Sequence, residues 1–171
     1  MCKYTTYFIP PKSFFEAESW AHLADWQEEL RPYYEEARRM LGATQHPYHS
    51  KSEKAMLTLA EQLNKKESFE KPHLAIYFGK PGEKVADPYF GGLGPDRTGC
   101  TLCGACMTGC RHNSKNTLDK NYLHLAQRLG ATIVAEREVV DVTPIESDGS
   151  GGYVITHQSS TGWGKDKKKI S

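Results

Sequence analysis

The sequence lacks both a strong excess of charge and a long apolar run. Its 22 lysine and arginine residues face 21 aspartate and glutamate residues, so the net charge is only +1. A protein that neutralises a nucleic-acid backbone usually carries a basic surface, so we expect no nucleic-acid partner. No apolar stretch reaches the ~20 residues of a membrane-spanning helix, and the start Met1-Cys2-Lys3-Tyr4 lacks the apolar part of a signal peptide. We therefore expect no transmembrane segment and a cytoplasmic location.

Most short motifs with a known catalytic mechanism are missing as well. There is no phosphate-binding loop with its lysine, no nucleophile elbow and no zinc-protease helix. The stretch Gly91-Gly92-Leu93-Gly94 does not follow the G-x-G-x-x-G pattern, so we expect no phosphate-binding turn there. The sequence therefore identifies no catalytic residue.

The N-terminal part of the chain has the pattern of a helical layer. Apolar residues at helical spacing predict one helix from about Glu18 to Leu30 and a second from Arg31 to Leu41, with Pro32 in its first turn. A third helix is predicted to run to about Asn64 after a capping box formed by Ser50 and Glu53. This part of the chain should therefore pack as helices.

The remainder mixes a long loop with one helix and β-structure. We expect a strand at His73–Phe78, a loop at Gly79–Gly99, a helix from about Thr117 to Gly130, a β-hairpin from Thr132 to His157, and a frayed basic tail at Gly164–Ser171. The fold class is therefore α+β, with an N-terminal helical layer, a long cysteine-containing loop, a helix and a C-terminal β-hairpin. We divide the chain into residues 1–99, a helical part with the long loop, 100–117, the cysteine-rich loop, and 118–171, the helix and hairpin.

Four of the five cysteines lie in one short run. Cys100, Cys103, Cys106 and Cys110 have the spacing C-x2-C-x2-C-x3-C, by which bacterial ferredoxins hold a [4Fe–4S] cluster. Two residues between cysteines allow tight turns that aim successive sulfurs at one centre. The run has no room to place its cysteines on separate elements, so we expect the four sulfurs to converge. The sequence therefore predicts a metal site with these four ligands.

Other interpretations of the same run remain open. In two-cluster ferredoxins the fourth cysteine binds the second cluster, so here Cys110 would have to bend back or Cys2 would have to supply a ligand. Arg111 occupies the position that is proline in the ferredoxin run. A zinc site, a disulfide such as Cys103–Cys106, and thiols that only pack are the alternatives, and the neighbouring His112 is a further candidate ligand.

The cysteine run and its surroundings also resemble a known enzyme family. The string from Cys100 to Leu118 is similar to the middle of bacterial glucose-methanol-choline (GMC) oxidoreductases, which use FAD, in the branch related to cholesterol oxidase. The resemblance extends over nearly the whole chain. It includes the segments Trp20–Trp26, Pro32–Tyr34 and Asp87–Gly92 upstream, and Asn121–Leu123 and Gly130–Val142 downstream.

The resemblance implies that the chain is an internal segment of a larger, two-domain fold with FAD and substrate domains. Members of the family begin with a strand, a G-x-G-x-x-G turn and a helix that bind FAD, and their catalytic histidine lies near the C-terminus. None of these is found in this sequence. The family also implies a role for Val139, whose backbone matches a valine that hydrogen-bonds the adenine of FAD. Valine is also a common residue in core strands that bind no cofactor.

The resemblance thus favours a fragment of an FAD-dependent oxidoreductase. Such an enzyme oxidises an alcohol group of a small, sterol-like or other apolar substrate by transferring a hydride to flavin. The remainder of the same polypeptide would be the partner of this chain, and the isolated chain would be inactive. The alternatives are a ferredoxin-like iron–sulfur module for electron transfer and an inactive truncated product.

Overall fold

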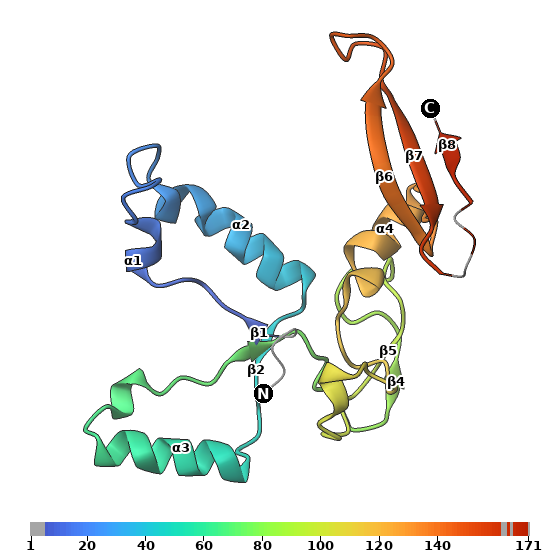
Figure 1. Ribbon diagram of the computed structural model, residues 1–171. Helices are drawn as coiled ribbons and strands as arrows, with labels where there is room; N and C mark the ends of the chain where they lie inside the picture. Colours follow the sequence, from blue (N-terminus) through green and yellow to red (C-terminus); the bar gives the residue numbers. More distant parts are fainter. Residues whose placement is uncertain (1–5, 162–163, 165, 171) are drawn as a thin grey trace. The chain divides into compact units, whose positions relative to one another are not determined.

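The chain has a mixed α+β structure, as predicted, and divides into two units (Figure 1). The computed structural model describes residues 6–161, 164 and 166–170. One unit is Met1–Leu129 and the other is Gly130–Ser171. The finer division into 1–99, 100–117 and 118–171 stays a prediction. No helix of the described part is long and apolar enough to cross a membrane.

The first helical region differs from the prediction. A single helix, α2 (Trp26–Met40), replaces the two predicted helices, and a short α1 (Lys12–Phe15) precedes it. The side chain of Asp25 caps α2 by accepting a hydrogen bond from the Glu28 amide, so the helix begins late and Pro32 lies inside it. The predicted start at Glu18 is wrong because the chain before Asp25 forms turns. Two indole N–H groups, of Trp20 and Trp26, donate to backbone carbonyls there.

The next helix, α3 (Lys51–Gln62), confirms the predicted capping box. Ser50 accepts from the Glu53 amide through its hydroxyl, and the Glu53 carboxylate accepts from the Ser50 amide in return. A short 3-10 helix, η1 (Lys66–Ser68), follows α3. The capping box fixes the start of α3, yet no residue of the helix is buried.

The three strands of a small antiparallel sheet are separated along the chain by these helices. Its order is β1 (Thr6–Tyr7), β3 (His73–Leu74) and β2 (Thr44–Gln45). The predicted strand at His73–Phe78 is thus shorter than expected, because the residues after Leu74 hydrogen-bond to the cysteine loop instead. Within the described part of the chain, the buried apolar side chains are those of Phe15, Met40, Ala43, Leu74, Ala75 and Ile76.

The predicted loop Gly79–Gly99 contains a two-stranded ladder, β4 (Lys84–Val85) with β5 (Arg97–Thr98). The cysteine run follows with a 3-10 helix, η2 (Ala105–Met107). The predicted helix after Thr117 is interrupted: η3 (Leu118–Lys120) and α4 (Tyr122–Arg128) are separated by Asn121, whose φ of −133° and ψ of −101° are not helical. The Asn121 side chain is buried and caps α4, which explains the break.

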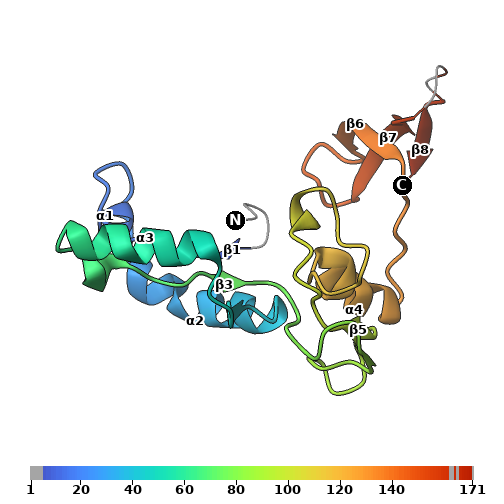
Figure 2. The same ribbon diagram turned by 90° about the horizontal axis from the view of Figure 1, so that it is seen from below.

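The second unit is a three-stranded antiparallel sheet. The predicted hairpin is present as β6 (Arg137–Pro144) and β7 (Tyr153–Ser159), with a register shift between Val139 and Asp141. The tail does not simply fray, since β8 (Lys168–Ile170) pairs with β7. Both views show the three strands side by side (Figures 1 and 2). Residues 165 and 171 of the predicted tail lie outside the described residues, as do residues 162–163 before it.

Candidate functional site

The two ends of the cysteine loop are held by one short segment, residues 75–77. The Tyr77 carbonyl accepts from the Cys100 amide at 3.0 Å, and the Tyr77 amide donates to the Ser114 carbonyl at 2.7 Å. The Ala75 carbonyl accepts from the Asn116 amide at 2.8 Å. Because the same extended segment binds both the entry and the exit of the loop, the run from Cys100 to Cys110 is closed at its base.

Tight turns inside the loop direct amide groups toward sulfur. Leu102 and Gly104 have positive φ angles of 59° and 73°, the second of which glycine adopts without steric cost. The Leu102 amide donates to Cys100 Sγ at 3.4 Å, and the Ser114 amide donates to Cys110 Sγ at 3.3 Å. Hydrogen bonds of this kind stabilise thiolates and tune metal centres that thiolates hold.

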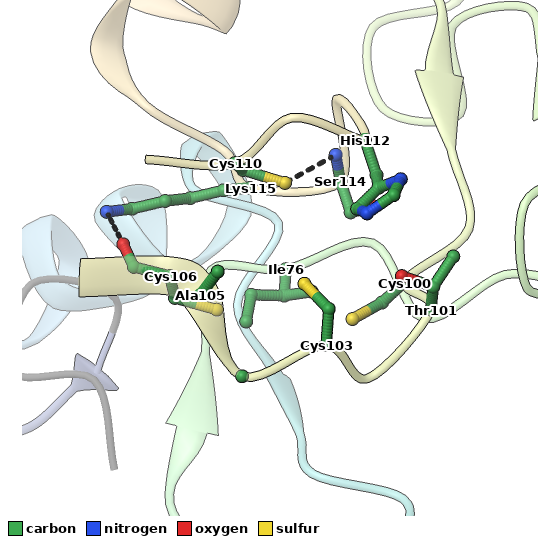
Figure 3. A pocket seen from close by; sticks show the side chains of 11 residues that line it. Ile76, Cys100, Thr101, Cys103, Ala105, Cys106, Cys110, His112, Ser114 and Lys115 are labelled. Atoms are coloured by element: carbon green, nitrogen blue, oxygen red, sulfur yellow. Dashed lines mark hydrogen bonds between the residues drawn. The ribbon is translucent and has the colours of Figure 1, made fainter. Parts of the chain in front are cut away.

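All four cysteines of the run line one small hollow that opens to solvent. The other lining residues are Ile76, Thr101, Gly104, Ala105, His112, Ser114 and Lys115. Figure 3 shows Cys100, Cys103 and Cys106 from the first part of the loop across the hollow from Cys110 and Ser114. Cys103 is exposed and the other three cysteines are half-buried.

The fold changes the acidity of the Cys110 thiol. Burial alone would raise its pKa, but hydrogen bonds from the backbone amides of Ser114, Lys115 and His112 outweigh burial, so the pKa of Cys110 is lowered. A lowered pKa increases the fraction of thiolate, the form that binds metals. The loop therefore favours the ligand form of this sulfur.

The structure restricts the alternatives for the run. Cys103 is a thiol, so the Cys103–Cys106 disulfide is not formed. Among the residues that the structure describes, no three histidine, cysteine, aspartate or glutamate side chains are close enough to hold a metal ion. His112 does line the hollow. Cys2, the other candidate fourth ligand, lies outside the described residues. The assignment of the four cysteines as metal ligands stays a prediction.

A buried arginine next to the loop is a feature that the sequence did not reveal. Arg97 is only 1% exposed, and its guanidinium donates to the Asn113 side chain at 3.1 Å and to the Lys115 carbonyl at 3.2 Å. It also hydrogen-bonds the Asn116 side-chain oxygen. Burial lowers the pKa of Arg97, although negative groups that include Cys110 oppose this. Nothing in the local sequence distinguishes a buried arginine from an exposed one.

Val139, the predicted contact to FAD, lies on β6 at the edge of the second unit's sheet and is 57% exposed. The Ser160 amide donates to the Glu136 carbonyl, which makes these residues a hydrogen-bonded pair. Pairs alternate along an antiparallel ladder, so Val139 and its partner His157 form a non-hydrogen-bonded pair. The Val139 amide and carbonyl then point away from β7, toward the outer edge. This geometry fits the donor and acceptor groups of an adenine edge.

Comparison with curated proteins finds relatives named cholesterol oxidase. One, from Acinetobacter baumannii, is 42% identical over 164 residues, which cover 92% of this chain and 30% of the relative. Two others, from Mycobacterium tuberculosis strains CDC 1551 / Oshkosh and ATCC 25618 / H37Rv, are 44% identical over 134 residues, which cover 75% of this chain and 23% of each relative. No protein-family profile and no solved structure matches the chain.

The chain thus spans less than a third of the length of these curated relatives, which fits the predicted fragment of a larger enzyme. The identity extends over most of this chain rather than over the cysteine run alone. Over most of its length the chain is therefore similar to an internal part of proteins named cholesterol oxidase, as the resemblance of its sequence predicts.

Proposed function

We propose that the chain is a segment of a cytoplasmic FAD-dependent oxidoreductase of the GMC type, and that the whole enzyme oxidises an alcohol group of a sterol-like or other apolar small molecule. The observation that carries this proposal is the identity of 42–44% to proteins named cholesterol oxidase. The chemistry that FAD supplies when bound is acceptance of a hydride from the alcohol carbon. The groups that remove the alcohol proton would lie elsewhere in the polypeptide.

Within this function, the second unit would contribute to binding of the nucleotide. The outward-pointing backbone of Val139 would donate to and accept from the adenine edge, a role that any side chain at this position permits. The adjacent register shift between Val139 and Asp141 supports this, because bulges often redirect a strand beside a binding site. Val139→Pro removes the amide donor, whereas Val139→Ile preserves it and serves as the matched control.

The test compares the isolated chain with the complete polypeptide that contains it. We expect the complete polypeptide to bind FAD and to lose the visible absorption of oxidised flavin when a 3β-hydroxysterol or another apolar alcohol is added anaerobically. The isolated chain should bind FAD weakly, since it lacks the glycine-rich turn that supplies most of the recognition of the pyrophosphate. A complete polypeptide without flavin, or with flavin that no alcohol reduces, would overturn the proposal.

A second candidate function is iron–sulfur electron transfer. The observation that favours it is the hollow that all four cysteines of the C-x2-C-x2-C-x3-C run share. The measurement that tests it is the content of iron and acid-labile sulfide after anaerobic purification. Both elements must be present in equal amounts, because iron without sulfide indicates only adventitious binding.

A further inference from the structure

We propose that the hollow lined by Cys100, Cys103, Cys106 and Cys110 binds a [4Fe–4S] cluster, and that buried Arg97 supplies part of its counter-charge. This inference deepens the second candidate function and rests on it, but it does not depend on FAD binding. The argument uses the chemistry of the lining residues, the spacing of the ligands, the polar groups beside the hollow and the surrounding charge.

The lining residues select the class of metal. Four side chains offer sulfur and His112 offers an imidazole, while none of the described lining residues is an aspartate or glutamate. Calcium, magnesium and manganese prefer oxygen ligands, whereas thiolates favour zinc, copper(I) and iron–sulfur centres. The donor set therefore points to a soft metal centre.

The spacing of the ligands favours a cluster over one ion. A single zinc ion holds four sulfurs at about 2.3 Å from one point, so it needs a tight set of side chains. All four cysteines line the same hollow, with Cys110 across it from the other three. A cubane is larger and is bound at its outer corners, so its four thiolates lie further apart. The consecutive run also differs from the paired C-x2-C knuckles of most structural zinc sites.

Polar groups beside the hollow face sulfur, as they would around a bound cluster. Ser114 is 1% exposed and lines the hollow, and its hydroxyl interacts with the Cys110 thiol. Hydrogen bonds from such a hydroxyl to ligand or inorganic sulfur tune an iron–sulfur centre. The amides of Leu102 and Ser114 already donate to sulfur, as expected around thiolate ligands.

The charge around the loop matches an anionic centre. Four thiolates with a [4Fe–4S]²⁺ core have a net charge of −2, and a buried centre of this charge requires nearby cations. The hydrogen bonds of the buried Arg97 guanidinium go to neutral oxygens, and Cys110 is among the negative groups that interact with its charge. Lys115 lines the hollow, and its Nζ donates to the Cys106 carbonyl at 3.1 Å. Arg97 and Lys115 are thus positioned as counter-charges.

Binding requires no oxidation of the protein. Two ferrous ions, two ferric ions and four sulfide ions make the 2+ core, and each of the four thiols releases a proton as its sulfur binds iron. The sulfurs remain thiolates throughout. The cluster can therefore be assembled on the reduced chain from ferrous and ferric salts and sulfide, without air.

The experiment reconstitutes the chain anaerobically and measures iron, acid-labile sulfide, zinc and visible absorption. We expect about four iron and four sulfide per chain for a [4Fe–4S] cluster, with broad absorption from charge transfer. Cys103→Ser should lose most of the cluster without unfolding, because Cys103 is exposed. Cys2→Ser is the matched control and should retain it. Zinc alone, iron without sulfide, or equal loss in both variants would overturn the proposed cluster.

The role of Arg97 is tested through the reduction potential, which a merely structural role would not change. Loss of a nearby positive charge makes the cluster harder to reduce, so Arg97→Gln should shift the potential to more negative values, whereas Arg97→Lys should shift it less. Because a buried substitution can prevent folding, Lys115→Met at the half-buried position beside the hollow provides a second variant with the same expected direction.

The two parts fail in distinguishable ways. A wild-type chain without iron and sulfide contradicts the cluster and the second candidate function together, and it leaves the FAD proposal unaffected. If the wild-type chain binds the cluster but its reduction potential is the same as that of the Arg97 and Lys115 variants, only the counter-charge role is contradicted.

Discussion

Helix α3 and the segment from residue 74 to 121 show opposite combinations of secondary structure and burial: α3 is regular but exposed, whereas the segment is irregular but contains many buried side chains. The 12 residues of α3 are helical and none is buried. The irregular segment contains only short elements, yet it holds most of the buried residues of the first unit: Leu74, Ala75, Ile76, Arg97, Ser114, Asn116 and Asn121. Four of these side chains are polar, so the order of this region comes largely from hydrogen bonds between side chains and backbone. Regular secondary structure therefore does not mark the core of this chain.

Among the polar side chains of the segment, the largest effect is expected at Asn116, which joins the segment to the end of α2. Its Nδ2 donates to the Leu41 carbonyl at 2.9 Å, and its oxygen accepts from Arg97. Asn116→Ala leaves the half-buried Leu41 carbonyl and part of the buried Arg97 guanidinium without partners, so we expect a loss of about 3 kcal/mol in the free energy of unfolding. Urea unfolding of the chain measures it, with the exposed Gln62→Ala as the control. If both variants lose equally little stability, the hydrogen bonds of Asn116 do not stabilise the irregular segment.

A smaller and pH-dependent effect is expected at Asp87. Its carboxylate accepts hydrogen bonds from the amides of Tyr89, Phe90, Gly92 and Gly94 at 2.8–3.0 Å. Burial raises the pKa of Asp87, but these four amides together lower it below the ordinary value.

Since the folded-state pKa of Asp87 is depressed, the stabilisation is complete above the unfolded pKa of about 3.9 and is lost as the pH falls through the folded value. Asp87→Asn should lower stability at neutral pH by about 1 kcal/mol, because the amide is a weaker acceptor than the carboxylate. Urea unfolding at several pH values measures both quantities. A variant that loses as much stability in acid as the wild-type chain would show that Asp87 does not contribute to the acid sensitivity.

A local effect of about 1 kcal/mol is expected at the start of α3. Ser50→Ala removes the hydroxyl that accepts from the Glu53 amide at 3.1 Å. Because α3 has no buried residue, the loss should appear as faster amide hydrogen exchange in α3 rather than as global unfolding. Gln62→Ala, at the exposed far end of the same helix, is the matched control and should leave exchange nearly unchanged. Faster exchange throughout residues 74–121 in Ser50→Ala would instead show that the two regions unfold together.

The same difference explains which features the sequence predicts. The capping box of Ser50 and Glu53 is a local pattern, so it was predicted correctly, and so was the β6–β7 hairpin with its alternating residues. The start of α2 was misplaced because apolar spacing continues upstream of Asp25, where a side-chain cap decides the boundary. The spacing of the cysteines placed them in one loop.

Two groups were missed because their partners are distant in sequence. Arg97 binds residues 113–116, and Asn116 binds the carbonyl of Leu41. Neither contact leaves a periodic pattern, since long-range pairs between side chain and backbone depend on the closed loop itself. The pairing of β8 with β7 was missed for a similar reason, because a lysine-rich tail has little strand propensity of its own.

The smallest effect is expected on the apolar side of α3. Met56 is 57% exposed, and glutamine has a similar length and helix propensity, so Met56→Gln should change the free energy of unfolding by less than about 0.5 kcal/mol. Leu74→Ala, at a buried position next to the irregular segment, should by contrast cost about 2–5 kcal/mol. Thermal and urea unfolding of both variants measure the difference. If Met56→Gln costs as much as Leu74→Ala, the apolar side of α3 is packed in solution, and burial does follow regular structure in this chain.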